Sequence, residues 1–387
     1  MKVAIVCIVK NEVDYMMEWL AYHRAVLGIN NFIVADNVSD DGTTQLLEAL
    51  DQGGVIKRVH FPRVNNEKGI QADAYNHILK TYGSQYDYMA FIDADEFIVN
   101  KTGLDFKKVL KKVAGNSDAG AIALNWKIFG SSGLYYQTNQ LVIDRFIWAS
   151  RSDHKFNHHI KSILKPSRIR EMFIHHAHLK KGKYYYDKNG KTIFIESIVE
   201  KEELDLGFVS PFSKVVENDK LYVAHYVIKS KDEHMLKKAK RGSAAGKVSR
   251  QKGMGYFKGH DLNQFECHDL SCHSDTVKTE IIQLEDMLKA KSFFYSSLRT
   301  HVDRFDSMLV GWVGLQDKKN IVVKLLVDNI TEITHSLNIA RPDALKAGVS
   351  VVERCGFEID ISKYDKKQLK IWVEGSNAIL WDGSKGY

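Results

Sequence analysis

Residues 86–97 read YDYMAFIDADEF, and in this stretch an apolar run ends at three carboxylates. Residues 89–92 are apolar without a break, which is typical of a strand covered on both faces of a parallel sheet. Ligands of such sheets bind beyond the carboxyl ends of the strands, where Asp93, Asp95 and Glu96 would lie. Because residues two apart on an extended backbone point the same way, we expect Asp93 and Asp95 to face one ligand.

Two carboxylates this close repel each other unless a cation or hydrogen-bond donors lie between them. Hard oxygen ligands suit Mg2+ or Mn2+, which also bind phosphate oxygens. The stretch therefore predicts a divalent-metal site at the end of a buried strand. The alternative is an acidic turn that follows a strand and binds nothing.

The composition is that of an ordinary soluble protein, with 44% hydrophobic and 27% charged residues in a chain of 387, long enough for two domains. No apolar run approaches the roughly 20 residues of a membrane span, and the run at residues 3–9 is too short for a signal peptide. The 4 cysteines are too few for a disulfide framework and fit a reducing compartment. We therefore expect a cytoplasmic protein.

The net charge of +7 is concentrated at residues 229–252, where nine Lys and Arg face only Asp232 and Glu233. Such a segment is attracted to phosphates or to an anionic membrane surface, so we expect a peripheral location on the inner face of the cell membrane. The alternative is a solvated helix face. The residues expected at the membrane are Lys237, Lys238, Lys240, Arg241, Lys247, Arg250 and Lys252.

Apolar runs that read as strands alternate with segments that read as helices. The strands are expected at 2–9, 30–35 and 55–61, and the helices at 15–27, 45–50 and 69–82. This alternation predicts an α/β fold with a doubly wound, mostly parallel sheet. Polar clusters follow the strands at 10–12, 36–41 and 93–96, as expected of one binding edge, although helix capping alone would also explain 36–41.

The order and spacing of several motifs resemble those of GT-A glycosyltransferases of the family 2 type, close to a family 92-like bacterial branch. These motifs are KNE at 10–12, EWLAYH at 18–23, DNVSDDGT at 36–43, Gln71 with AYN at 74–76, and DADEF at 93–97. The similarity continues with NWKIFGSSG at 125–133, DRF at 144–146, KSILKP at 161–166 and HYVIKS at 225–230. It covers about residues 1–260.

The resemblance implies a site for a UDP-sugar and a metal. Asp36 and the first strand ends would hold the uridine, and Asp93, Asp95 and His225 would hold Mn2+ or Mg2+ on the diphosphate. The metal would stabilise the charge that grows on the leaving nucleoside diphosphate. Alternatively, His225 is a hydrogen-bonded histidine of the core that binds no metal. The residues expected to bind the nucleotide sugar are Lys10, Asn11, Glu12, Asp36, Asn37, Gln71, Asp93, Trp126, Ser131, Ser132 and Lys161.

Four of these residues have chemical reasons of their own. Trp126 offers a flat face on which a sugar ring can stack, although a core position is an alternative. Ser131 and Ser132 lie between two glycines that allow close approach to a sugar or phosphate, although a plain turn is equally compatible. Lys161 has the charge to bind a diphosphate.

Transfer with inversion needs a carboxylate base near the acceptor hydroxyl. Glu96, Asp144 and Asp153 are candidates for this base, and the sequence does not choose among them. Alternatively, Asp144 forms an ion pair with its neighbour Arg145.

We predict three domains: a GT-A domain at 1–230, a helical basic extension near the acceptor side at 231–304, and an accessory β-sandwich at 305–387. The last follows from short apolar runs at 308–313, 321–327, 357–361 and 369–373. Such a domain would bind glycan or pack against another chain, which makes an oligomer an expected state.

The sequence therefore predicts a metal-dependent, inverting glycosyltransferase. It would move a sugar from a UDP-sugar, UDP-galactose being the first donor to test, to a glycan or lipid-linked glycan acceptor in bacterial surface polysaccharide or lipooligosaccharide synthesis. No nucleic-acid partner is expected. One alternative is a nucleotidyltransferase, which would need a glycine-rich basic loop where residues 10–12 stand. Another is a non-catalytic carbohydrate-binding protein.

Overall fold

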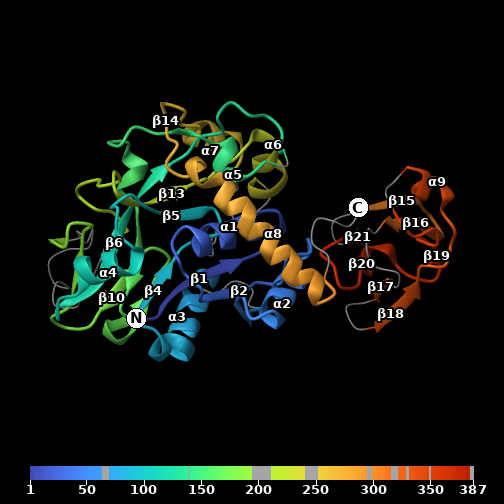
Figure 1. Cartoon of the computed structure of the whole chain (residues 1–387), viewed down its shortest axis with the longest axis horizontal. Helices are drawn as coiled ribbons and strands as arrows, with labels where there is room; N and C mark the ends of the chain where they lie inside the picture. Colours follow the sequence, from blue (N-terminus) through green and yellow to red (C-terminus); the bar gives the residue numbers. More distant parts are fainter. Residues whose placement is uncertain are drawn as a thin grey trace. The chain divides into compact units, whose positions relative to one another are not determined.

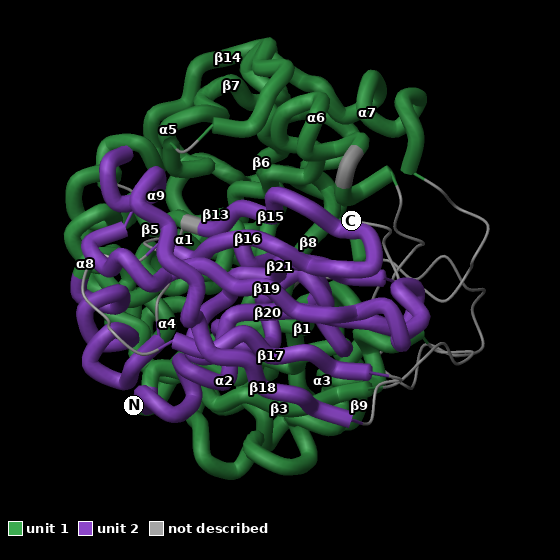
Figure 2. Tube along the Cα trace, turned by 90° about the vertical axis from the view of Figure 1, so that its right-hand side faces the viewer, with its two compact units in different colours: residues 1–9, 14–37, 55–282 green, residues 10–13, 38–54, 283–387 purple. Residues whose placement is uncertain are grey.

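The computed structural model describes residues 1–62, 69–138, 140–193, 211–239, 252–293, 299–314, 321–327, 331–347 and 350–383. The chain forms two compact units, drawn in two colours in Figure 2. The first consists of residues 1–9, 14–37 and 55–282, and the second of residues 10–13, 38–54 and 283–387. The predicted domain boundaries at residues 230 and 304 stay a prediction.

Among the described residues, ten strands of the first unit form one mixed sheet. They are β1 (Val3–Val9), β2 (Phe32–Asp36), β3 (Lys57–His60), β4 (Tyr88–Phe91), β5 (Glu96–Asn100), β6 (Ala119–Ile128), β8 (Ile160–Leu164), β11 (Tyr184–Tyr186), β12 (Thr192–Ile193) and β13 (Leu221–His225). The order is β12-β11-β6-β8-β4-β1-β2-β3, and β13 pairs with β5 and β6. Strands β3, β2, β1 and β4 are parallel, whereas β8 runs antiparallel to both β4 and β6.

Helices cover the parallel part of the sheet on both faces (Figure 1). On α3 (Ile70–Tyr82), Tyr75 and Ile78 pack into a core with Ile33 of β2. On α1 (Val13–Ala25), Trp19 packs against Phe32. Phe32 and Ile33 are successive residues of β2, so their side chains point to opposite faces of the sheet. The predicted α/β fold with helices on both sides of the sheet is thereby confirmed.

The acidic stretch forms the turn between β4 and β5. Strand β5 begins at Glu96, and β13 pairs with it antiparallel, which sets His225 opposite Glu96. The same β13 runs parallel to β6, so that His225 also lies opposite Ile128. A histidine more than a hundred residues downstream therefore lies beside the acidic turn.

The shorter elements around this sheet are α4 (Phe106–Ala114), α5 (Val142–Arg145), β7 (Trp148–Ala149), β9 (Ile169–Met172), β10 (Ala177–Leu179), α6 (Lys231–Glu233), a π-helical turn (His234–Lys238), α7 (Met254–His260) and β14 (Phe265–Glu266). The 3-10 turns are Gly83–Gln85, Lys155–His158, Pro166–Arg168, Ser271–His273 and Lys366–Gln368. Helix α8 (Ser274–Ala290) connects the two units along the chain.

The second unit contains two small antiparallel sheets, which confirms the predicted all-β region. One has the order β15 (Arg299–Phe305), β16 (Met308–Gly314), β19 (Gly356–Asp360), and the other β18 (Thr331–Ser336), β17 (Val322–Val327), β20 (Leu369–Val373), β21 (Ile379–Asp382). Alternate residues along these strands, such as Leu309, Val323 and Ile371, form one apolar core. Helices α2 (Thr43–Gln52) and α9 (Pro342–Lys346) also belong to this unit.

The expectation that the chain has no membrane span can be examined for the residues that the structure describes. None of the helices in the described ranges is long and apolar enough to cross a membrane.

Candidate active site

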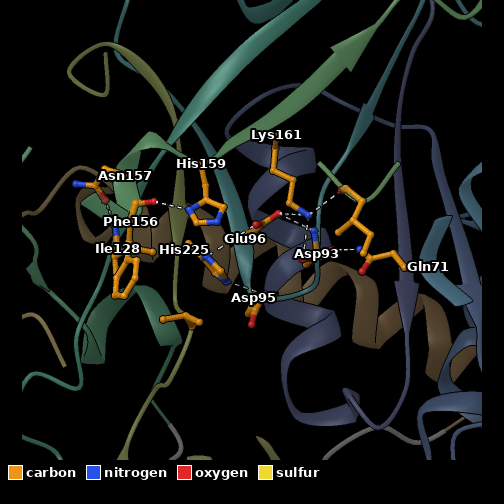
Figure 3. Close-up of polar contacts among 12 residues, drawn as sticks. Gln71, Asp93, Asp95, Glu96, Ile128, Phe156, Asn157, His159, Lys161 and His225 are labelled. Carbon is orange, nitrogen blue, oxygen red and sulfur yellow. Dashed lines mark hydrogen bonds and ion pairs between the residues drawn. The ribbon is translucent and has the colours of Figure 1, made fainter. Parts of the chain in front are cut away.

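Asp93 is held in place by hydrogen-bond donors from two other elements. Its Oδ1 accepts hydrogen bonds from Gln71 Nε2 at 2.5 Å and from the Tyr75 hydroxyl at 3.2 Å, both on α3. Its Oδ2 pairs with Lys161 Nζ of β8 at 2.9 Å (Figure 3). Since a lysine and an amide together satisfy this carboxylate, the acidic turn is not merely solvated.

Lys161 lies beneath the turn and is only 1% exposed. Its Nζ also lies 3.4 Å from Oε2 of the fully buried Glu96, which accepts a hydrogen bond from the backbone N–H of Asp93 at 2.9 Å. Burial opposes the charge of Lys161, but Asp93 and Glu96 raise its pKa above the usual value. The charge of Lys161 therefore offsets that of Asp93 and lies beside the carboxyl of Glu96.

Burial raises the pKa of Glu96 to about 8; Lys161 opposes this shift, and the charges of Asp93 and Asp95 add to it. This carboxyl is therefore mostly protonated at neutral pH.

Asp95 has different partners from Asp93. Its Oδ2 pairs with Lys238 Nζ at 2.5 Å, and its Oδ1 lies 3.5 Å from His225 Nε2. Burial alone would raise the pKa of Asp95, but Lys238 and His225 hold it well below its usual value. Asp95 is therefore ionised at all pH values at which the protein is expected to work.

Aromatic rings line the next part of the site. Trp126 stacks on His159 with ring centroids 4.5 Å apart and packs against His225 at 4.3 Å and His175 at 5.3 Å. Figure 3 shows His159 and His225 close to Glu96 and Asp95. Burial lowers the pKa of all three imidazoles, that of His159 to about 4. This wall of the site is therefore uncharged at neutral pH.

Several buried polar atoms of this group have no hydrogen-bond partner within the ranges that the structure describes. They are Glu96 Oε1, His225 Nδ1, Trp126 Nε1 and His175 Nδ1. Buried polar groups are nearly always paired in folded proteins, directly or through water. Two of them, Glu96 Oε1 and His225 Nδ1, lie 3.9 Å from each other.

Asp36 ends β2 as predicted, and its side chain is fully buried. Its Oδ2 accepts hydrogen bonds from Arg58 Nη2 at 2.8 Å and Nε at 3.2 Å. The neighbouring Asn37 donates from its side chain to the Phe61 carbonyl at 2.9 Å. A role of Asp36 and Asn37 toward uridine stays a prediction.

Lys10, Asn11 and Glu12 belong to the second unit, together with residues 38–54. The backbone N–H of Asn11 donates to Ser39 Oγ at 3.2 Å, and that of Glu12 donates to Thr43 Oγ1 at 2.9 Å. The predicted strand-end clusters at 10–12 and 38–41 therefore contact each other. Their contact with a nucleotide stays a prediction.

Ser131 and Ser132 lie in a turn that packs against the segment before β14. Their backbone N–H groups donate to Asp261 Oδ1 and Asn263 Oδ1, both at 2.8 Å. A Cβ added at Gly130 would lie 2.3 Å from Asn263 Oδ1, so the glycine is needed for this close packing. These contacts account for the sequence of the turn without a ligand.

The structure brings one of the three base candidates into contact with Asp93, and this is Glu96. Asp144 Oδ2 instead accepts a hydrogen bond from Ser274 Oγ at 2.7 Å and lies 3.3 Å from Lys278 Nζ. Asp153 is 69% exposed and pairs with Arg151 at 3.1 Å.

Sequence reasoning missed four residues of this group: Tyr75, His159, His175 and Lys238. The run His175-His176-Ala177-His178 was a usable signal, since clustered histidines often mark a site. Lys238 was assigned to the basic segment, where charge counting hid its contact with Asp95.

The predicted metal ligands are Asp93, Asp95 and His225. Within the part of the chain that the structure describes, no group of three or more His, Cys, Asp and Glu side chains is arranged to hold a metal ion. In this arrangement the carboxylates receive positive charge from Lys161 and Lys238. The residues as placed therefore do not fit a metal, and metal binding stays a prediction.

Comparison with known families gives the class of the protein. The model of glycosyltransferase family 92 matches residues 3–238, more than half of the chain. The chain belongs to glycosyltransferase family 92. The match includes the acidic turn, Lys161, His225 and Lys238.

Curated relatives of the family come from plants. A family 92 protein of Ricinus communis is 25% identical over 199 residues, covering 50% of this chain and 34% of the relative. A family 92 protein of Arabidopsis thaliana is 26% identical over 184 residues, covering 44% of this chain and 30% of the relative. The chain thus spans about a third of the length of these relatives.

Solved structures resemble the chain only weakly. S. aureus TarS is 12% identical and covers 99% of this chain and 77% of its own, with a TM-score of 0.32. A shorter form of TarS in complex with UDP is 17% identical and covers 43% of this chain and 47% of its own, with a TM-score of 0.28. Both TM-scores are too low to carry an argument.

Proposed function

We propose that this family 92 glycosyltransferase transfers a sugar from a UDP-sugar to a hydroxyl of a glycan acceptor with inversion at the anomeric carbon. The observation that carries the proposal is the group at the end of β4, where Asp93, Asp95 and Glu96 meet Lys161 and Lys238. Membership of family 92 supports this reaction over the nucleotidyltransferase and the non-catalytic alternatives.

In the proposed reaction the acceptor oxygen forms a bond to the anomeric carbon as the bond from that carbon to the diphosphate oxygen breaks. The electron pair leaves with UDP, and the acceptor proton passes to a base. Glu96 is the proposed base because it is the candidate that contacts Asp93, and its pKa of about 8 gives it a high proton affinity once ionised. Its side chain is fully buried in the ligand-free chain, so this role requires the acidic turn to open when the acceptor binds.

Dependence on Mn2+ or Mg2+ is part of the proposal, although the residues as placed do not form a metal site. A cation that binds Asp95 has to displace Lys238, so metal affinity in the absence of nucleotide should be weak. Titration of Mn2+ by calorimetry, with and without UDP, measures this directly.

The proposed acceptor is a surface polysaccharide or a lipid-linked glycan, which would bring the enzyme to an anionic membrane. The predicted membrane residues Lys240, Arg241, Lys247 and Arg250 lie outside the described residues. Lys237 pairs with Asp14, and Lys238 with Asp95. Sedimentation with anionic and neutral vesicles at low and high salt tests the attraction, which should vanish in high salt.

Nucleotide binding tests the donor class. UDP should bind and raise the melting temperature, and ADP and GDP should do so less at equal concentration. Equal binding of all three nucleotides, or of none, would contradict a UDP-sugar donor.

A further inference from the structure

Lys238 is placed by a rigid turn. It ends the π-helical turn His234–Lys238, a rare geometry that is frequently found at functional sites. The preceding Glu233 forms a buried bidentate pair with Arg145, at 2.8 and 3.0 Å, and accepts a hydrogen bond from the Tyr15 hydroxyl at 2.9 Å. Ser230 and Glu233 also form a capping box.

The ammonium of Lys238 contacts the acidic turn, and its side chain is 22% exposed. Its Nζ contacts both Asp95 Oδ2 and the Val227 carbonyl. Lys237, its neighbour, turns the other way and pairs with Asp14, which is 41% exposed. Adjacent lysines in one basic segment thus have different environments.

Two lysines neutralise the acidic turn, and they differ in accessibility. Lys161 is 1% exposed and lies beneath the turn, whereas Lys238 is 22% exposed. Of these two ammonium groups, only that of Lys238 can therefore be reached by an entering ligand without opening the sheet. A lysine is a mobile point charge that binds phosphate well.

We propose that Lys238 binds the diphosphate of the nucleotide and that Asp95 positions its ammonium for this contact in the ligand-free chain. The inference rests on the proposed function, because it presupposes a nucleoside diphosphate at this site. It moves Lys238 from the membrane-binding set to the donor site, and it makes Asp95 a positioning residue as well as a candidate metal ligand.

A hydrogen bond between charged groups contributes about 1.5–3 kcal/mol, which corresponds to a roughly 10- to 100-fold change in affinity. In the presence of EDTA, Lys238→Gln should therefore weaken UDP binding at least about tenfold, measured by calorimetry. Binding of uridine, which has no phosphate, should stay within about twofold. Lys237→Gln is the matched control, since it removes the same charge one residue earlier, and its UDP affinity should equal that of the wild type.

A second measurement uses the metal as a probe without nucleotide. Because Lys238 and a cation compete for Asp95, Lys238→Gln should bind Mn2+ more tightly than the wild type. Lys238→Arg keeps the charge and is the variant to measure if Lys238→Gln does not fold. It should bind UDP more tightly than uridine.

The outcomes separate the two claims. If the wild type binds no UDP, the proposed function fails and the inference falls with it. If the wild type binds UDP and Lys238→Gln binds it equally well, only the inference fails. A loss of uridine and UDP binding to the same extent would also overturn it, since the defect would then not involve phosphate. Unchanged Mn2+ affinity in Lys238→Gln would contradict the positioning by Asp95.

Discussion

Replacing Lys161 by Met should destabilise the first unit strongly. The Lys161 side chain is 1% exposed, and its Nζ lies 2.9 Å from Asp93, which is 30% exposed, and 3.4 Å from the fully buried Glu96. Its removal leaves both carboxyl groups without their cation. Breaking a buried ion pair by removing one partner costs about 3–5 kcal/mol. At about 2–4 °C per kcal/mol for a unit of this size, the melting temperature should fall by roughly 6–20 °C.

The pH dependence of this loss has a definite sign. In the wild type the pKa of Glu96 is raised from 4.5 to about 8, so the folded state holds a proton that the unfolded state releases above pH 4.5. The contribution of Glu96 to stability therefore falls as pH rises from 4.5 to 8. Without Lys161 the pKa of Glu96 rises further, so Lys161→Met should lose more stability at pH 8 than at pH 4.5.

Thermal melts followed by circular dichroism at these two pH values measure both effects. Arg151→Met is the control, because Arg151 is 60% exposed and pairs at 3.1 Å with Asp153, which is 69% exposed, and surface pairs contribute about 0–1 kcal/mol. An equal, small shift for both variants would refute the assignment of Lys161 as the buried counter-ion.

Three further substitutions test individual roles. If Glu96 is the base, wild-type activity should rise with pH through about 8. Glu96→Gln should be slower by about a hundredfold and should no longer show this rise. A rise of activity with pH that persists in Glu96→Gln would exclude Glu96 as the base. Asp36→Ala should weaken UDP binding by about tenfold and metal binding less, because it frees Arg58, and an equal loss of both would place Asp36 at the metal instead. Asp95→Ala should abolish metal-dependent UDP binding while the far-UV spectrum stays unchanged, and retained activity at saturating Mn2+ would contradict the assignment.

The acidic turn could be predicted because an apolar run that ends at carboxylates is a local pattern. The alternation of strands and helices gave the parallel part of the sheet for the same reason. The antiparallel β8 could not be predicted, since its direction depends on pairing with both β4 and β6. It is this strand that places Lys161 beneath Asp93.

The counter-ions of the site come from far along the chain. Lys161 is 68 residues from Asp93, and Lys238 is 143 residues from Asp95. No local periodicity reports such contacts, and for Lys238 the surrounding basic residues suggested a different role. His225 could be named through its motif, but its position opposite Glu96 follows from the pairing of β13 with β5.

The most direct test of the central claim is turnover of a panel of UDP-sugars, UDP-galactose included, with and without Mn2+ and with EDTA. The account predicts release of UDP from at least one of these donors, and it predicts that Asp93→Asn with Asp95→Asn removes this release while the protein stays folded. Absence of UDP release from every donor, or release that the double variant retains, would contradict it.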